Sequence, residues 1–238
     1  MTSETQLRAD FQPFIDADGM VCPTRGAGSQ NGLLYTAEYM VILQQNHMYG
    51  GIDFLDFGHL IKKCETSEGV LSRTPSKAGG QEGPDDYTGV AAASSAFADS
   101  MVDHGRSHFW VFNNVGKDIR NPDGSINWAA FFIRFPALVA HMRYSAGYRP
   151  NLFLKTAWRL SVLTCGLLNN DQDSWILTWL LIHAAGDRGT VNKFITRTWV
   201  RKLRKRFPGG ISEVFRNYFG FNHPISRYAQ DFVARDLT

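Results

Sequence analysis

Two long apolar stretches in the second half of the chain limit most strongly what it can fold into. They run over residues 152–168 and 175–185. Lys155 and Arg159 interrupt the first stretch, and the second is about half as long as the roughly 20 residues that a membrane span needs. Both stretches therefore predict central helices of a water-soluble protein with no membrane span, buried by the rest of the chain.

Apolar residues elsewhere recur at helical spacing, which predicts an all-α protein. The expected helices cover 32–46, with Asn31 as N-cap, and 54–63, 127–146, 191–207 and 212–219. No segment alternates convincingly, although 110–112 could form a short strand. We expect a single compact all-α domain of antiparallel helix pairs over 1–238, with a long loop at 66–84 that is rich in glycine and proline. Within it, 1–30 would be an irregular lead-in, 31–186 the core helices and 190–238 the basic C-terminal helices.

The three cysteines indicate the compartment. Cys22, Cys64 and Cys165 are odd in number, far apart and without the spacing of a zinc site. We therefore expect buried thiols in a reducing compartment, the cytoplasm, since residues 1–10 hold no apolar signal segment. No nucleotide-binding or metalloprotease motif is present, so we expect neither a cofactor nor a metal.

The first candidate site is the start of the helix expected at 32–46. Asn31 precedes a glycine, and Tyr35 and Glu38 are three residues apart on one helix face. An aromatic ring can stack on a sugar while a nearby carboxylate protonates or activates it. The alternative interpretation is an ordinary helix start with a half-buried tyrosine and a solvated glutamate.

The second candidate site follows the long loop. Asp85 and Asp86 are adjacent carboxylates at a helix start, where they suit acid–base work because neighbouring acids separate each other's pKa values. The alternatives are simple N-capping and a contact with a metal or with substrate hydroxyl groups. The acids at 171–173 could likewise form half of a metal site, although capping is the favoured interpretation there. The residues that we predict to contact a substrate are Asn31, Tyr35, Arg73, Lys77, Tyr87, His141 and Trp175.

Residues 31–186 resemble the helical (α/α) toroid carbohydrate-active enzymes in their helix pairs, their Asp-Asp-Tyr helix start and their many aromatic residues. The resemblance implies a glycoside hydrolase or lyase with a glycan substrate. In it Glu38 would be the acid and Asp85 or Asp86 the base. The aromatic platforms would be Tyr35, Tyr87 and Trp175. The chain also resembles bacteriophage-encoded proteins, which would allow a place in the virion.

The third feature is the basic helix expected at 191–207. Its cations surround an apolar stripe of Ile195, Trp199, Leu203 and Phe207. Such a surface suits a protein partner or a polyanion, and predicts as an alternative a non-enzymatic structural or interaction protein of a phage particle. Non-specific nucleic-acid binding and an ordinary solvated face stay open as well. The six cations are Arg197, Arg201, Lys202, Arg204, Lys205 and Arg206.

Overall fold

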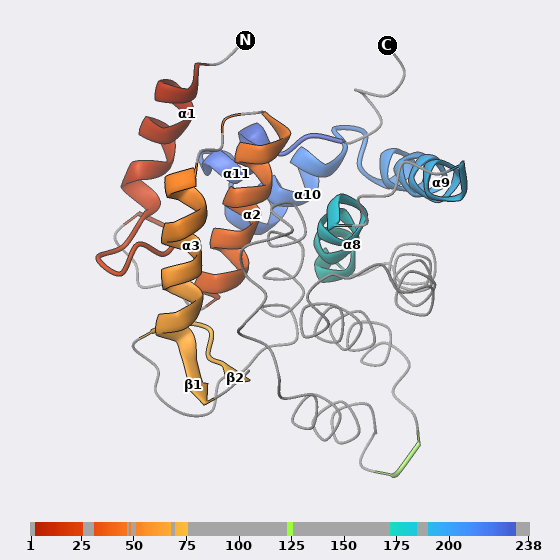
Figure 1. The fold of residues 1–238 in the computed structure, drawn as a ribbon. Coiled ribbons are helices and arrows are strands. Elements are labelled where there is room, and N and C mark those ends of the chain that lie inside the picture. Colours follow the sequence, from red (N-terminus) through yellow and green to blue (C-terminus); the bar gives the residue numbers. More distant parts are fainter. Residues whose placement is uncertain are drawn as a thin grey trace.

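The fold is helical in the part of the chain that the structure, a computed structural model, describes (Figure 1). The described residues are 3–25, 31–46, 48, 51–67, 70–75, 123–125, 172–184 and 190–231. This confirms the helical class for these residues. The predictions for 110–112, 127–146, 152–168 and the later part of the long loop lie outside them, and the toroid stays a prediction.

The N-terminal segment forms one helix and then turns back on itself. Helix α1 (Glu4–Phe11) begins at Ser3, whose hydroxyl accepts a hydrogen bond from the Gln6 N–H at 3.2 Å. A 3₁₀ turn, η1 (Gln12–Phe14), and an isolated bridge between Ile15 and Val21 follow. The segment is more than a lead-in, because its apolar side chains, among them Leu7 and Phe11, belong to the main hydrophobic core.

Helices α2 (Gly32–Gln45) and α3 (Gly51–Cys64) follow and contact each other. The two agree with the helices expected at 32–46 and 54–63. A small antiparallel hairpin, β1 (Glu65–Ser67) and β2 (Val70–Leu71), comes directly after α3. The long loop expected at 66–84 was therefore placed wrongly at its start, since its first residues form this hairpin.

Four helices close the described part of the chain: α8 (Gln172–Ala184), α9 (Thr190–Arg206), α10 (Ile211–Phe219) and the short α11 (Pro224–Tyr228). Helix α10 contacts both α8 and α11, and α11 contacts α1 and α2 (Figure 1). The two ends of the described chain thus share one core, in which Trp175, Trp179 and Trp199 are the largest enclosed side chains.

Two findings bear on the environment of the protein. None of the described helices is both long and apolar enough to span a membrane. Cys22 and Cys64 are buried thiols, as predicted, whereas Cys165 lies outside the described residues.

Candidate functional site

The start of α2 brings together residues that are distant in sequence. The Arg73 carbonyl, just after β2, accepts a hydrogen bond from the Leu33 N–H at 3.1 Å and so satisfies one N–H at the start of α2. The Arg73 guanidinium donates to the Asn31 side-chain oxygen at 2.7 Å. Asn31 holds the N-cap position that its sequence predicts, but its side chain makes no capping bond and binds Arg73 instead.

Tyr35 and Glu38 extend this group into the core. Both are buried, with exposed fractions of 5% and 0%, so the interpretation with a half-buried tyrosine and a solvated glutamate is wrong. Burial raises the pKa of Tyr35 above its usual range, and the nearby Tyr218 and Glu38 raise it further, while a hydrogen bond with Asn31 lowers it. The structure thus groups four predicted site residues: Asn31, Tyr35, Glu38 and Arg73.

The remaining residues predicted for the glycan site are placed less favourably. Trp175 is 1% exposed and packs against Trp199 and Phe207, with ring centroids 6.0 and 5.9 Å away. An enclosed ring offers no face on which a sugar could stack, so the predicted stacking platform at Trp175 is wrong. The ring of Tyr35, at 5% exposure, is also enclosed and does not form the predicted platform either. The predicted residues Lys77, Asp85, Asp86, Tyr87 and His141 lie outside the described part of the chain.

Helix α9 has the two-sided character that its sequence predicts. Ile195, Trp199 and Leu203 are buried, and Phe207, just after the helix, is partly buried against the core. Its 17 residues hold no acidic side chain. The cations, apart from the half-buried Lys202, are exposed: Arg197, Arg201, Arg204, Lys205 and Arg206.

The six cations do not form one equivalent surface. The Lys202 ammonium lies 5.2 Å from the centre of the Trp175 ring, and Arg206 lies 5.7 Å from that of Phe207. Arg204 pairs with Asp231. That leaves a row of three, Arg197, Arg201 and Lys205, which we call the α9 cationic row. No ion pair joins this row to any described residue.

The row lies on one face of the helix. Its members are four residues apart, so they follow one another at about 6 Å along the helix axis. Phe194, one turn before Arg197, is 70% exposed and continues the same face. Sequence reasoning missed Phe194, although its spacing of three residues from Arg197 was a usable signal.

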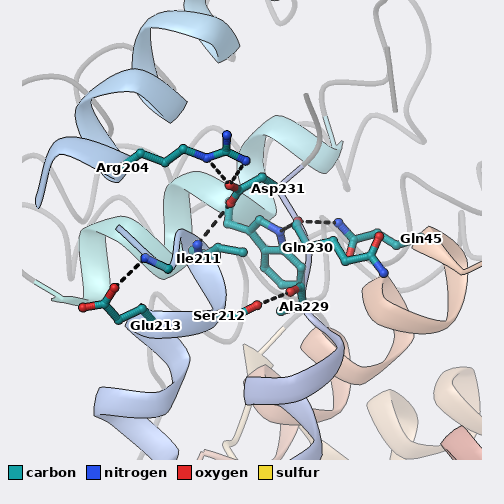
Figure 2. A network of polar contacts seen from close by, with 10 residues as sticks. Gln45, Arg204, Ile211, Ser212, Glu213, Ala229, Gln230 and Asp231 are labelled. Carbon is teal, nitrogen blue, oxygen red and sulfur yellow. Dashed lines mark hydrogen bonds and ion pairs between the residues drawn. The ribbon is translucent and has the colours of Figure 1, made fainter. Parts of the chain in front are cut away.

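A polar network holds the end of α9 against the start of α10 (Figure 2). The Asp231 carboxylate accepts hydrogen bonds from the Arg204 Nε at 3.0 Å and from the Ile211 N–H at 3.1 Å. Since the N-cap of α10 is Gly210, which has no side chain, Asp231 supplies the capping oxygen from elsewhere in the chain. The side chain of Asp231 is only 7% exposed, whereas that of Arg204 is 55% exposed, so the ion pair is shielded from water on the Asp231 side alone.

The same segment is tied to two further helices. The Gln230 carbonyl accepts from the Gln45 amide on α2 at 3.0 Å and from the Trp179 indole N–H on α8 at 3.1 Å (Figure 2). Residues 230 and 231 therefore connect α9, which carries the cationic row, to α2, α8 and α10.

Other kinds of site find less support. The described residues contain no group of three His, Cys, Asp or Glu side chains that could hold a metal ion. In comparisons with known proteins, no family model, curated protein or solved structure matched the chain.

Proposed function

We propose that the protein is a non-enzymatic interaction protein that binds a negatively charged partner through the α9 cationic row. The observation that carries this proposal is the row itself: three exposed cations in line, without an ion pair to a described residue, on a helix that holds no acid. Like charges four residues apart on a helix destabilise it slightly. A partner that brings negative charge removes this repulsion when it binds.

The chemistry of the face favours a polyanion, or the acidic face of a protein, over an apolar partner. Stable interfaces of the apolar kind have a hydrophobic core surrounded by a polar rim. On the exposed side of α9, Phe194 is the only large apolar side chain that stands out among the described residues. Attraction between charges therefore supplies most of the binding, and it acts over several ångströms before contact.

The test is binding of a labelled polyanion by fluorescence anisotropy at several salt concentrations. The probes are a single-stranded oligonucleotide, heparin and poly-glutamate. Three phosphate contacts predict that the logarithm of the oligonucleotide affinity falls by roughly 2–3 for each tenfold rise in salt. The double variant Arg201→Glu with Lys205→Glu should abolish binding.

The matched control reverses Lys62 and Lys63, two exposed cations at the end of α3. It changes the net charge equally but leaves α9 untouched, so it should reduce the affinity far less. An equal loss in both double variants would show that net charge, rather than the α9 row, attracts the probe. Binding that does not depend on salt would contradict the proposal outright.

A second candidate function rests on the group around Glu38. We propose for this group a glycan-active enzyme, a hydrolase or lyase, in which Glu38 is the acid and Asp85 or Asp86 the base. The supporting observation is a carboxylate at 0% exposure beside Tyr35, because strongly desolvated ionisable groups are frequent at catalytic sites. The carboxylates would need to lie about 5–9.5 Å apart, depending on whether the enzyme retains or inverts.

This second function is tested by the products released from a panel of polysaccharides. A hydrolase produces new reducing ends, and a lyase also produces unsaturated sugars. Glu38→Gln should abolish release, while Glu213→Gln, on the outer part of α10, should not. If the wild-type protein releases nothing from the panel, or if Glu38→Gln releases as much as the wild type, the enzymatic proposal fails.

A further inference from the structure

A pocket of about 510 Å³ opens where α10 ends, away from the cationic row. Gly220 ends α10 with φ +90°, and the chain turns through Phe221 and Asn222 before His223 begins α11. The opposite wall comes from Phe14 in η1 and from residues 23–25. Two parts of the chain that are about 200 residues apart thus form one concave site, of a volume that is usual for small ligands.

The floor of the pocket is aromatic and held in one arrangement. The His223 ring stacks on Phe219 with centroids 4.6 Å apart, and Phe14 meets it edge-on at 4.5 Å. His223 Nδ1 accepts a hydrogen bond from the Ile225 N–H, so its Nε2 carries the proton and donates to the Cys22 carbonyl at 2.9 Å. Both ring nitrogens are therefore occupied, and the uncharged imidazole, which is only 1% exposed, supports the rings of Phe14 and Phe219 from below.

The rim supplies a single charge. Arg25 is exposed, with its guanidinium carbon 5.3 Å from the centre of the Phe14 ring. It is the only charged residue that lines the pocket, and it has no ion pair with a described residue. Phe221 is 75% exposed, an unusual position for a large apolar side chain, and Arg216 lies over its ring at 5.1 Å.

We propose that this pocket binds a flat aromatic group that carries a carboxylate. The ring of the ligand would lie among Phe14, Phe219 and Phe221, because aromatic rings attract one another in offset and edge-on arrangements. The carboxylate would meet Arg25, whose guanidinium has the geometry to bind it in a bidentate manner. The exposed amide of Asn222 at the rim offers a further donor. This site is independent of the α9 cationic row.

The test uses naphthalene-2-carboxylate as the probe and follows the backbone amides of the full chain by two-dimensional NMR. The expected result is saturable shifts at Thr24, Arg25, Phe221 and Asn222. Naphthalene-2-carboxamide, which has the same shape without the charge, should bind about fivefold more weakly. The proposal would be overturned if these amides showed no saturable shifts. It would also be overturned if the two probes bound with equal affinity.

Two variants locate the interaction. Arg25→Gln should reduce the affinity for the carboxylate to that of the carboxamide. Phe221→Ala, at an exposed position where the fold is retained, should weaken both probes several-fold. The controls are Arg201→Gln and Phe194→Ala on α9, which remove the same kinds of side chain elsewhere. The proposal is overturned if either pocket variant binds like the wild type, or if a neutral sugar such as glucose displaces the probe.

Discussion

Helices α2 and α9 are of similar length but sit in the protein in opposite ways. Of the 14 residues of α2, only Tyr39 and Gln44 are not fully buried. Helix α9 has a buried stripe of Ile195, Trp199 and Leu203. Among its residues from 194 onward, whose side chains the structure describes, the exposed ones are cations and Phe194. The first helix is a central element of the core, and the second covers the core while facing the solvent.

Because of this contrast, a charged residue has a different energetic cost and a different possible role in each helix. Glu38 on α2 is completely enclosed, and an enclosed carboxylate is costly unless other groups compensate it. Arg201 on α9 keeps its charge in water, where it costs little and remains available to a partner. A charge therefore points to an internal polar site in α2 and to an external binding surface in α9.

The largest loss of stability that we expect comes from shortening a buried side chain of α2. Leu43→Ala removes a side chain at 0% exposure and leaves a cavity, so it should lower the free energy of unfolding by about 2–5 kcal/mol. Arg201→Ala on the exposed side of α9 should change it by no more than about 0.5 kcal/mol. Urea denaturation followed by circular dichroism measures both. Similar losses in the two variants would refute the contrast between the helices.

Sequence patterns predicted the helices well because helical periodicity is a local property. The expected ranges 32–46, 191–207 and 212–219 correspond to α2 (Gly32–Gln45), α9 (Thr190–Arg206) and α10 (Ile211–Phe219). The hairpin after α3 was missed because strands of three and two residues are too short to show alternation. Its residues therefore look like the beginning of a polar loop.

The sites were less predictable, because they depend on contacts between distant parts of the chain. Asn31 and Arg73 meet across 42 residues, and Arg204 and Asp231 across 27. No local pattern announces either pair. The burial of Trp175 likewise depends on Trp199 and Phe207, which belong to a later segment. Sequence could name candidate residues, but it could not tell which cations of α9 are already engaged.

A second prediction concerns the link between α9 and the core. Gly210 and Gly220 both have positive φ with extended ψ, a conformation that is essentially restricted to glycine. An alanine Cβ at Gly210 would also lie 2.7 Å from the Asp231 carboxylate, whereas no described atom lies within 4 Å of that position at Gly220. Gly220→Ala should therefore cost about 1–3 kcal/mol of stability, and Gly210→Ala more.

Thermal unfolding of the two glycine variants separates the cost of backbone strain, which both share, from the cost of the clash with Asp231, which only Gly210→Ala has. If Asp231 fixes the end of α9, combining Gly210→Ala with Asp231→Ala should cost less than the sum of the single changes, because the clash is relieved. Strict additivity would mean that the added Cβ does not clash with Asp231, and backbone strain alone would then explain the cost at Gly210.

A third prediction concerns pH and the packing around α11. Burial lowers the pKa of His223 below its ordinary value of 6.5, and the nearby Arg227 adds to this, although the hydrogen bond to the Cys22 carbonyl opposes it. The folded protein thus binds a proton less readily than the unfolded chain. Stability should be fully present above pH 6.5 and fall as the pH drops below it, by at most about 1.4 kcal/mol per pH unit.

Chemical denaturation between pH 5 and pH 8 provides the measurement. His223→Gln should flatten the acid side of the profile, whereas His59→Gln, at an exposed position on α3, should leave its shape unchanged. A profile of His223→Gln that still falls like the wild type would mean that another group causes the loss.

The smallest effect on stability separates the two kinds of cation within α9. Arg201→Glu places a carboxylate four residues from both Arg197 and Lys205, and each such pair stabilises a helix by about 0.2–0.5 kcal/mol. Arg204→Glu instead places a carboxylate beside Asp231 and breaks an existing ion pair, so it should destabilise the protein. Urea denaturation of both variants, at low salt, measures this difference.

These signs matter more than the magnitudes. If the row served only solubility, Arg201→Glu would make the helix more stable without removing any binding activity. If polyanion binding disappears in the variant that folds better, then the wild-type row sacrifices stability for binding, as functional surfaces often do. If Arg201→Glu instead destabilises the protein as strongly as Arg204→Glu does, then Arg201 has a structural role. The distinction between α9 cations that contact other residues and those of the cationic row would then be wrong.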